Sequence, residues 1–160
     1  MERGIIKRIL FVCHGNICRS PMAEFCMKDL VNREGLGERF VIASAATSTE
    51  EIYRGIGNPV YPPAARELSR HGISCADKRA VRLTKEDYGK YDLLIGMDQS
   101  NLRDMREILG GDPEGKIRLL LDYTERPGDI ADPWYTGDFS RTWDDVLRGC
   151  TGLLRELTEQ

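Results

Sequence analysis

The apolar residues of the chain fall into two kinds of segment that alternate along the sequence. Short, nearly continuous apolar runs predict buried strands, and apolar residues at helical spacing predict amphipathic helices. The predicted strands are 5–12, 40–43, 92–97 and 117–121, with a weaker one at 80–83. The predicted helices are one that follows Ser20-Pro21, then 64–71, 84–88 and 101–109, and a long final one marked by apolar residues from Trp143 to Leu157. In the first helix, Ser20 is interpreted as the N-cap and Pro21 as the first helical residue.

This alternation of strands and helices favours an α/β fold. We expect three layers, with a central four-stranded parallel sheet of order 2-1-3-4 and helices on both faces. In such a sheet a ligand binds beyond the carboxyl ends of the strands, so the turn after the first strand is the first place to search for a site. The 160 residues contain no repeat, low-complexity segment or linker, and one domain spanning 1–160 is predicted.

Composition and charge argue against several classes of partner. The formal net charge is −3, from 23 Lys and Arg against 26 Asp and Glu, so the basic surface of a protein that binds nucleic acid is missing. No apolar run approaches the ~20 residues that span a bilayer, and the first residues do not form a signal-peptide pattern, so no membrane contact is expected. The scattered cysteines form neither a disulfide framework nor a zinc motif, which favours a cytoplasmic protein with reduced thiols and no metal. The cysteines are Cys13, Cys18, Cys26, Cys75 and Cys150.

The segment after the first strand, VCHGNICRSP at 12–21, carries a Cys-x5-Arg pattern from Cys13 to Arg19. A turn from a strand into a helix directs several backbone N–H groups into one concavity, and the helix N-terminus adds partial positive charge. We therefore expect this loop to bind a phosphate group, with Arg19 contributing a bidentate, charge-assisted pair to two phosphate oxygens. The other predicted phosphate-binding residues are His14, Gly15, Asn16, Ile17, Cys18 and Ser20.

The same positive field would stabilise a thiolate at Cys13. A thiolate that faces a bound phosphoryl group is placed for in-line attack and a phosphocysteine intermediate, and Ser20 could donate its hydroxyl hydrogen to the sulfur. From the spacing alone, a buried structural cysteine beside a surface arginine is the alternative.

Two aspartates after the last strand, Asp129 and Asp132, are candidates for a general acid that protonates the leaving oxygen. The residues themselves leave both open, although Pro133 would stiffen the backbone beside Asp132. Trp134 and Tyr135 are interpreted as aromatic walls for a phenyl ring, with core packing under the loop as the alternative.

The segment VCHGNICRSP resembles the signature loop of the low-molecular-weight protein tyrosine phosphatases, and further segments in family order extend the resemblance over nearly the whole chain. It implies hydrolysis of phosphotyrosine in proteins, and of small aryl phosphates, by Cys13 as nucleophile with Asp132 as general acid and base. It also implies that Ser44 and His71 brace Asn16, that Cys18 can form a reversible disulfide with Cys13, and that Trp134 and Tyr135 contact the substrate ring. No cofactor is expected, the expected ligands are a phosphotyrosine protein and inorganic phosphate or other oxyanions, and the protein is expected to be a monomer. The further segments are SAATS at 44–48, GNP at 57–59, KEDYGKYDLLIGMDQSNLRDM at 85–105 and DPWY at 132–135.

Two features depart from the family pattern. His14 stands where an apolar residue is common, and the segment 49–66 is longer than usual, so its residues cannot be matched to family positions. Three other functions are weighed: an arsenate reductase, which needs further cysteines for its relay; a phosphoarginine phosphatase, which resembles this family with a threonine at the position of Ile17; and a non-catalytic phosphate-binding module, which has no use for Cys13 with Asp132.

Overall fold

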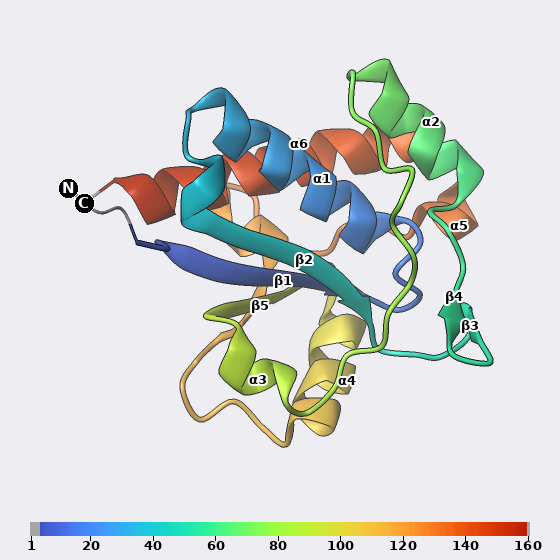
Figure 1. The fold of residues 1–160 in the computed structure, drawn as a ribbon, viewed down its shortest axis with the longest axis horizontal. Coiled ribbons are helices and arrows are strands. Elements are labelled where there is room, and N and C mark those ends of the chain that lie inside the picture. The colour runs from blue at the N-terminus through green and yellow to red at the C-terminus, as the bar shows by residue number, and fades with distance from the viewer. Residues whose placement is uncertain (1–3, 160) are drawn as a thin grey trace.

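The computed structural model describes residues 4–159 (Figure 1). Its main sheet has four parallel strands in the order β2-β1-β5-β6, which confirms the predicted order 2-1-3-4. The central strand β1 pairs with β2 on one side and with β5 on the other, so the chain reverses its direction of travel across the sheet at β1. The strands are β1 Lys7–Cys13, β2 Phe40–Ala46, β5 Leu93–Gly96 and β6 Ile117–Leu119.

Helices cover both faces of this sheet and make three layers (Figure 1). Helices α1 and α6 pack on one face, with α2 lying against both of them, and α4 packs on the other face beside β5 and β6. A 3-10 turn, η1, precedes β2, and another, η2, follows β6. The helices are α1 Arg19–Arg33, α2 Pro62–Arg70, α3 Asp87–Lys90, α4 Gln99–Leu109, α5 Pro133–Thr136 and α6 Phe139–Thr158, and the 3-10 turns are η1 Gly37–Arg39 and η2 Leu120–Tyr123.

The apolar run of β1 explains why both faces need a covering layer. Successive side chains of a strand point to opposite faces, so Ile9 and Phe11 enter the core under α1 and α6, whereas Leu10 and Val12 enter the core under α4. All four side chains are buried, and burial of each stabilises the fold by about 1.5–3 kcal/mol. Packing on both faces of the sheet therefore fixes the position of the end of β1, where Cys13 lies.

Four predicted segments differ from the structure. The helix predicted at 84–88 forms at 87–90, as α3. The segment 80–83 is wrong as a strand, because it forms only an isolated bridge between Arg82 and Ala46, and the N–H of Val81 bonds to Asn16 instead of to a neighbouring strand. The last strand ends at Leu119, and its predicted final residues form η2. The loop expected after the second strand contains a short antiparallel hairpin of β3 Ile52–Tyr53 and β4 Ile56–Gly57.

Among the described residues, no helix combines the length and the apolar character needed to cross a membrane. The same residues contain no group of three or more His, Cys, Asp or Glu side chains arranged to hold a metal ion.

Candidate active site

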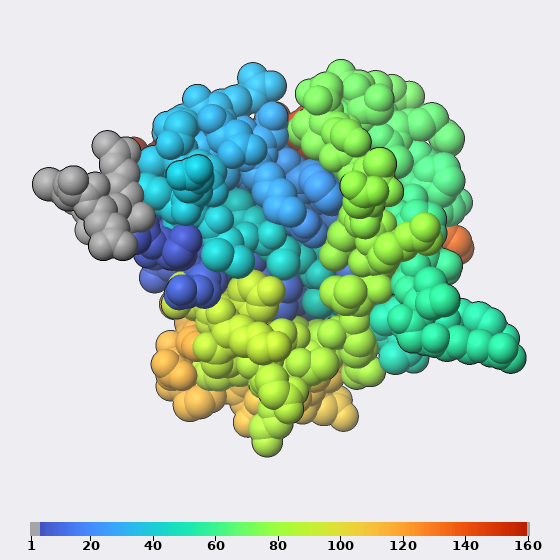
Figure 2. Space-filling model, in the orientation of Figure 1, coloured from blue at the N-terminus to red at the C-terminus, as the bar shows by residue number. Residues whose placement is uncertain are grey.

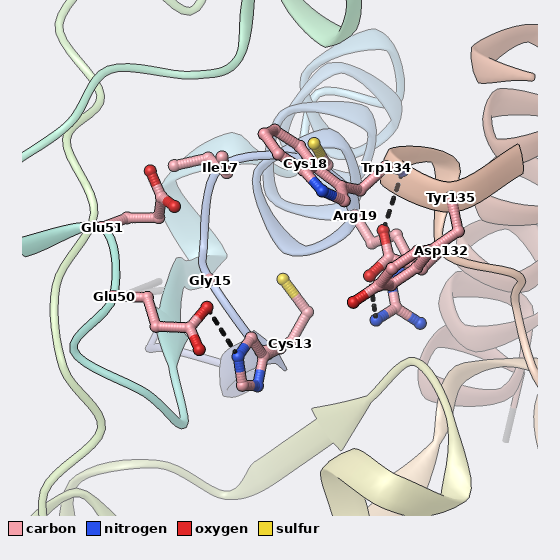
Figure 3. A pocket seen from close by; sticks show the side chains of 11 residues that line it. Cys13, Gly15, Ile17, Cys18, Arg19, Glu50, Glu51, Asp132, Trp134 and Tyr135 are labelled. Carbon is pink, nitrogen blue, oxygen red and sulfur yellow. Dashed lines mark hydrogen bonds and ion pairs between the residues drawn. The ribbon is translucent and has the colours of Figure 1, made fainter. Parts of the chain in front are cut away.

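A pocket of about 140 Å³ opens at the carboxyl end of β1, where the expected loop joins β1 to α1 (Figure 3). The pocket brings together residues from three separate parts of the chain: the loop after β1, the turn before β3, and the start of α5. The lining residues are Cys13, His14, Gly15, Ile17, Cys18, Arg19, Glu50, Glu51, Asp132, Trp134 and Tyr135.

Cys13 is buried at the floor of this pocket, with Ser20 as its neighbour. The Ser20 hydroxyl oxygen lies 3.0 Å from the Cys13 sulfur, and the Ser20 backbone nitrogen lies 3.4 Å from it. The prediction of Ser20 as the helix N-cap is therefore wrong. Helix α1 begins at Arg19, Cys18 occupies the N-cap position without a side-chain cap, and the Ser20 hydroxyl contacts the sulfur instead of the backbone.

Asn16 shapes the loop. Its backbone has φ of 60°, a left-handed conformation that asparagine tolerates better than most residues. Its side-chain nitrogen donates to the hydroxyls of Ser20 at 2.8 Å and Ser44 at 2.9 Å. Its side-chain oxygen accepts from the N–H of Val81 at 3.0 Å. Because every group is buried or partly buried, these contacts define the loop's shape more firmly than exposed hydrogen bonds would.

His71 does not brace Asn16, and that expectation is wrong. Its ring Nε2 lies 3.0 Å from a carboxylate oxygen of Glu67, one turn earlier in α2, and the ring stacks on Trp143 with centroids 4.1 Å apart. His71 follows the last residue of α2, so packing of α2 against α6 directs its ring away from the loop.

Glu24 and Lys78, which the sequence analysis missed, extend the Asn16 contacts in place of His71. The Ser44 hydroxyl donates to Glu24 at 2.6 Å, and the Lys78 ammonium donates to the Ser44 carbonyl at 3.0 Å and lies 3.5 Å from the Glu24 carboxylate. Lys28 pairs with the other Glu24 oxygen at 2.6 Å. Burial lowers the pKa of Lys78, against the opposing attraction of Glu24. The signal in the sequence is a glutamate beside Ala23 and Cys26, two residues of the apolar stripe of the predicted helix.

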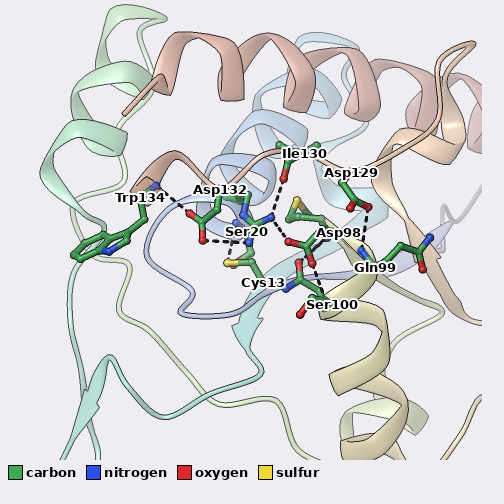
Figure 4. A network of polar contacts seen from close by, with 12 residues as sticks. Cys13, Ser20, Asp98, Gln99, Ser100, Asp129, Ile130, Asp132 and Trp134 are labelled. Atoms are coloured by element: carbon green, nitrogen blue, oxygen red, sulfur yellow. Dashed lines mark hydrogen bonds and ion pairs between the residues drawn. The ribbon is translucent and has the colours of Figure 1, made fainter. Parts of the chain in front are cut away.

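Arg19 is held by oxygens of Asp98, Ile130 and Asp132, which Figure 4 labels. Its Nη1 donates to Asp98 at 2.7 Å and to the carbonyl of Ile130 at 2.8 Å, and its Nη2 lies 3.5 Å from Asp132. Only 3% of the residue is exposed. Burial alone would lower the pKa of the guanidinium, yet the charges of Cys13 and Asp98 raise it above its ordinary value. Arg19 is therefore a fixed positive charge at the floor of the pocket.

The two candidate acids lie in different places. Asp129 accepts a hydrogen bond from the Gln99 N–H at the start of α4, at 3.0 Å, and does not line the pocket. Asp132 lines the pocket, and one of its oxygens accepts from the Trp134 N–H at 3.0 Å at the start of α5. That contact orients the carboxylate and leaves its second oxygen on the side of Arg19. Of the pair that the sequence left open, Asp132 lines the pocket and Asp129 does not.

Trp134 and Tyr135 form one side of the pocket mouth, as Figure 3 shows. They are 55% and 84% exposed, so they are not core residues under the loop. The Trp134 ring packs against Tyr61, with centroids 4.8 Å apart, which holds its orientation while its other face stays open.

Glu50 and Glu51 form the opposite side of the mouth (Figure 3), and His14 also lines the pocket. The His14 ring lies 3.1 Å from Glu50, and a Cβ placed on Gly15 would lie 3.3 Å from the Glu51 side chain, so glycine permits this close approach. At the floor, burial raises the pKa of the Cys18 thiol far above its ordinary value, so Cys18 is a neutral thiol beside Cys13. Glu50 and Glu51 were not among the predicted site residues, although both line the pocket.

Comparison with known proteins identifies the family. Residues 8–160 match the family model described as low molecular weight phosphotyrosine protein phosphatase. The chain is 36% identical over 154 residues to the low molecular weight protein-tyrosine-phosphatase YfkJ of Bacillus subtilis, covering 95% of this chain and 96% of that protein. It is 38% identical over 161 residues to the low molecular weight phosphotyrosine protein phosphatase of Gallus gallus, covering 98% of this chain and 99% of that protein.

Solved structures of phosphatases match the fold of this chain. The crystal structure of YfkJ matches with a TM-score of 0.90 at 36% identity, covering 99% of this chain and 100% of that one. A protein tyrosine phosphatase from Entamoeba histolytica, with Hepes in its active site, matches with a TM-score of 0.86 at 26% identity, covering 95% and 97% of the two chains. The fold, the matched length and these relatives together place the chain in the low molecular weight phosphotyrosine protein phosphatase family, and the protein is a protein tyrosine phosphatase.

Proposed function

We propose that the chain hydrolyses phosphotyrosine in proteins, and small aryl phosphates, through a phosphocysteine intermediate on Cys13. Arg19 and the backbone amides of the loop bind the phosphate, and Asp132 is the general acid and base. The observation that carries this proposal is the meeting of Cys13, Arg19 and Asp132 in one pocket, although Asp132 is far from the other two in sequence.

In the first step the Cys13 thiolate attacks phosphorus. The sulfur–phosphorus bond forms as the bond from phosphorus to the aryl oxygen breaks, and Asp132 gives its proton to the departing phenolate. The positive charge of Arg19, at the floor, stabilises the charge on the equatorial oxygens of the transferring group.

In the second step water attacks the phosphocysteine. Asp132, now ionised, takes the proton from the water, the sulfur–phosphorus bond breaks, and inorganic phosphate leaves. The sulfur departs as a thiolate, which accepts the hydrogen of the Ser20 hydroxyl 3.0 Å away. Neither step needs a redox partner, and no step runs through a cofactor.

The mouth of the pocket supports phosphotyrosine as the substrate class. Cys13 is buried at the floor of the pocket, whereas Trp134 and Tyr135 are exposed at its mouth. A phosphate that contacts the Cys13 sulfur therefore needs a long, flat ester group that extends from the floor to the mouth. Hepes carries a tetrahedral sulfonate, and its presence in the active site of the Entamoeba histolytica relative supports an oxyanion site on this fold.

The cysteine positions argue against a reductase. Of the five cysteines, all with free thiols, only Cys13 and Cys18 line the pocket, whereas Cys26, Cys75 and Cys150 lie in the apolar core under α1 and α6. A thiol relay from Cys13 through those residues has no path along the pocket surface.

The test is turnover of p-nitrophenyl phosphate and of matched phosphotyrosine, phosphoserine and phosphoarginine peptides. We expect release of p-nitrophenol and selective hydrolysis of the phosphotyrosine peptide. Cys13→Ser should abolish turnover while retaining phosphate affinity, because the loop amides and Arg19 bind the anion. Cys75→Ser, a matched change outside the pocket, is the control. Turnover of Cys13→Ser near the wild-type rate would refute the nucleophile, and hydrolysis of phosphoarginine in preference to phosphotyrosine would refute the substrate.

A further inference from the structure

The two sides of the pocket mouth differ in chemistry. One side is aromatic, formed by Trp134 and Tyr135, and the other is acidic, formed by Glu50 and Glu51 in the turn between β2 and β3 (Figure 3). Glu50 faces His14 at 3.1 Å with both side chains largely exposed, and the Glu51 carboxylate accepts from the neutral amide of Asn58 at 3.0 Å. Among the described residues, no Lys or Arg pairs with either carboxylate at this mouth.

These carboxylates cannot serve the phosphate itself. The phosphate subsite is the floor, where Arg19 and the loop amides supply positive charge, and negative groups near it weaken the binding of a dianion. Glu50 and Glu51 stand at the mouth, on the side that a polypeptide meets when its tyrosine enters the pocket. Their charge therefore acts on the residues next to the phosphotyrosine.

The acidic side is held in place before any substrate arrives. The Asn58 N–H donates to the Glu51 carbonyl at 2.8 Å, and the Ile52 N–H donates to the Thr49 carbonyl at 3.0 Å, so Glu51 stands on a closed turn. The Glu51 side chain also packs over Gly15 of the phosphate loop. A preordered carboxylate loses less conformational entropy on binding than a mobile one.

The hairpin that follows Glu51 extends this surface outward. Figure 2 shows it as the segment that projects from the right side of the molecule. At its tip Tyr53 is 71% exposed and Ile56 is 68% exposed. With Trp134 and Tyr135, they make four of the seven large hydrophobic side chains that are exposed in the described part of the chain. Apolar side chains gathered on the segments that form the mouth are typical of a surface that contacts a protein partner.

We propose that Glu50 and Glu51 make this enzyme select phosphotyrosine segments that carry Lys or Arg beside the tyrosine, with the hairpin contacting residues farther along the same segment. The inference rests on the proposed function, because it names the substrate class of the same site. Exposed ion pairs of this kind change kcat/KM by about two- to fivefold each. Two carboxylates together give a preference of roughly tenfold for a basic over an acidic neighbourhood at low salt, and the preference falls as salt screens it.

The experiment compares two phosphotyrosine peptides that differ only in having Lys or Glu at the two positions on each side of the tyrosine. The measured quantity is the ratio of their kcat/KM values, taken for wild type, Glu50→Gln, Glu51→Gln and the double variant. We expect the Lys peptide to be favoured by wild type, with most of the difference in KM, and the ratio to fall toward 1 in the double variant. Glu107→Gln, an equal charge change on the exposed face of α4, is the matched control and should keep the wild-type ratio.

Each outcome bears on one proposal. A wild-type ratio near 1, a preference for the Glu peptide, or a ratio that the double variant leaves unchanged would each overturn the inference. Turnover of p-nitrophenyl phosphate by the same preparations separates this from the proposed function, because a protein that releases p-nitrophenol without discriminating the peptides keeps the activity and loses only the selectivity.

Discussion

Replacement of Asn16 by alanine tests whether the contacts beneath the phosphate loop hold it in its active shape. The substitution removes three hydrogen bonds, to Ser20, to Ser44 and from Val81, with lengths of 2.8, 2.9 and 3.0 Å. It also leaves alanine at φ of 60°, a conformation that alanine adopts poorly.

The expected loss of stability is the sum of the lost hydrogen bonds and the backbone strain. Each lost hydrogen bond contributes about 0.5–1.5 kcal/mol, which sums to about 1.5–4.5 kcal/mol. The left-handed backbone adds about 1–2 kcal/mol for alanine. We therefore expect Asn16→Ala to lower the free energy of unfolding by about 2.5–6.5 kcal/mol. Asn16→Gly loses the same hydrogen bonds without the backbone strain. Since glycine costs about 0.5–1 kcal/mol in chain entropy, this variant should be up to about 1.5 kcal/mol more stable than the alanine variant.

Urea unfolding of the two variants measures these free energies, and p-nitrophenyl phosphate kinetics under folding conditions measures the loop. Misplacement of the loop amides and of Ser20 should lower kcat/KM by about 10²-fold in both variants. The reasoning would be refuted by an Asn16→Ala variant that loses less than about 1 kcal/mol, or by one that keeps wild-type kcat/KM. An alanine variant more stable than the glycine variant would show that the left-handed backbone is not the source of the strain.

Two further predictions use pairs of matched substitutions. Asp132→Asn should slow hydrolysis of aryl phosphates with poor leaving groups by about 10²–10⁴-fold, whereas Asp129→Asn, outside the pocket, should have the smaller effect; the reverse order in steady-state kinetics would reassign the acid. Gly152→Ala should destabilise the fold by about 1–3 kcal/mol in thermal or urea unfolding, because its Cβ would lie 2.0 Å from the carbonyl oxygen of Tyr123. Gly89→Ala, in α3 with nothing within 4 Å of its Cβ, should be neutral or stabilising, and equal losses in the two variants would contradict this packing argument.

The sheet could be predicted because its two central strands carry buried apolar runs, one around Phe11 and one around Leu94. The segment at 80–83 has a similar local composition, yet Val81 is half exposed and its N–H bonds to a side chain. Nothing local in the sequence distinguishes an N–H that meets a strand from one that meets Asn16. The hairpin at 52–57 could not be predicted either, because strands of two residues are too short to show a periodic pattern.

In the active site, too, one part could be predicted from the sequence and another could not. The loop could be predicted because its chemistry is contiguous, from Cys13 to Ser20, and the resemblance supplied Asp132. The partners of Arg19 could not be predicted, because Asp98 and the carbonyl of Ile130 reach it only through the packing of the strands β1 and β5. Asp98 is the N-cap of α4 in the structure, and nothing local in the sequence directs its second oxygen toward Arg19.

The donor and the acceptor can be assigned in each hydrogen bond beneath the loop. Glu24, paired with Lys28 and Lys78, is an acceptor when ionised, so the Ser44 hydroxyl must donate its hydrogen to it. Ser44 then accepts from Asn16, whose amide orientation is set by the Val81 N–H on its oxygen. Asn16 gives its second hydrogen to Ser20.

Since the Ser20 oxygen is already an acceptor, its own hydrogen remains for the Cys13 sulfur, 3.0 Å away. A sulfur at Cys13 can accept that hydrogen, so this series of contacts ends with a donor that faces the sulfur. The buried Glu24 carboxylate, which does not line the pocket, therefore sets the direction of each donor up to the sulfur that we propose as the nucleophile.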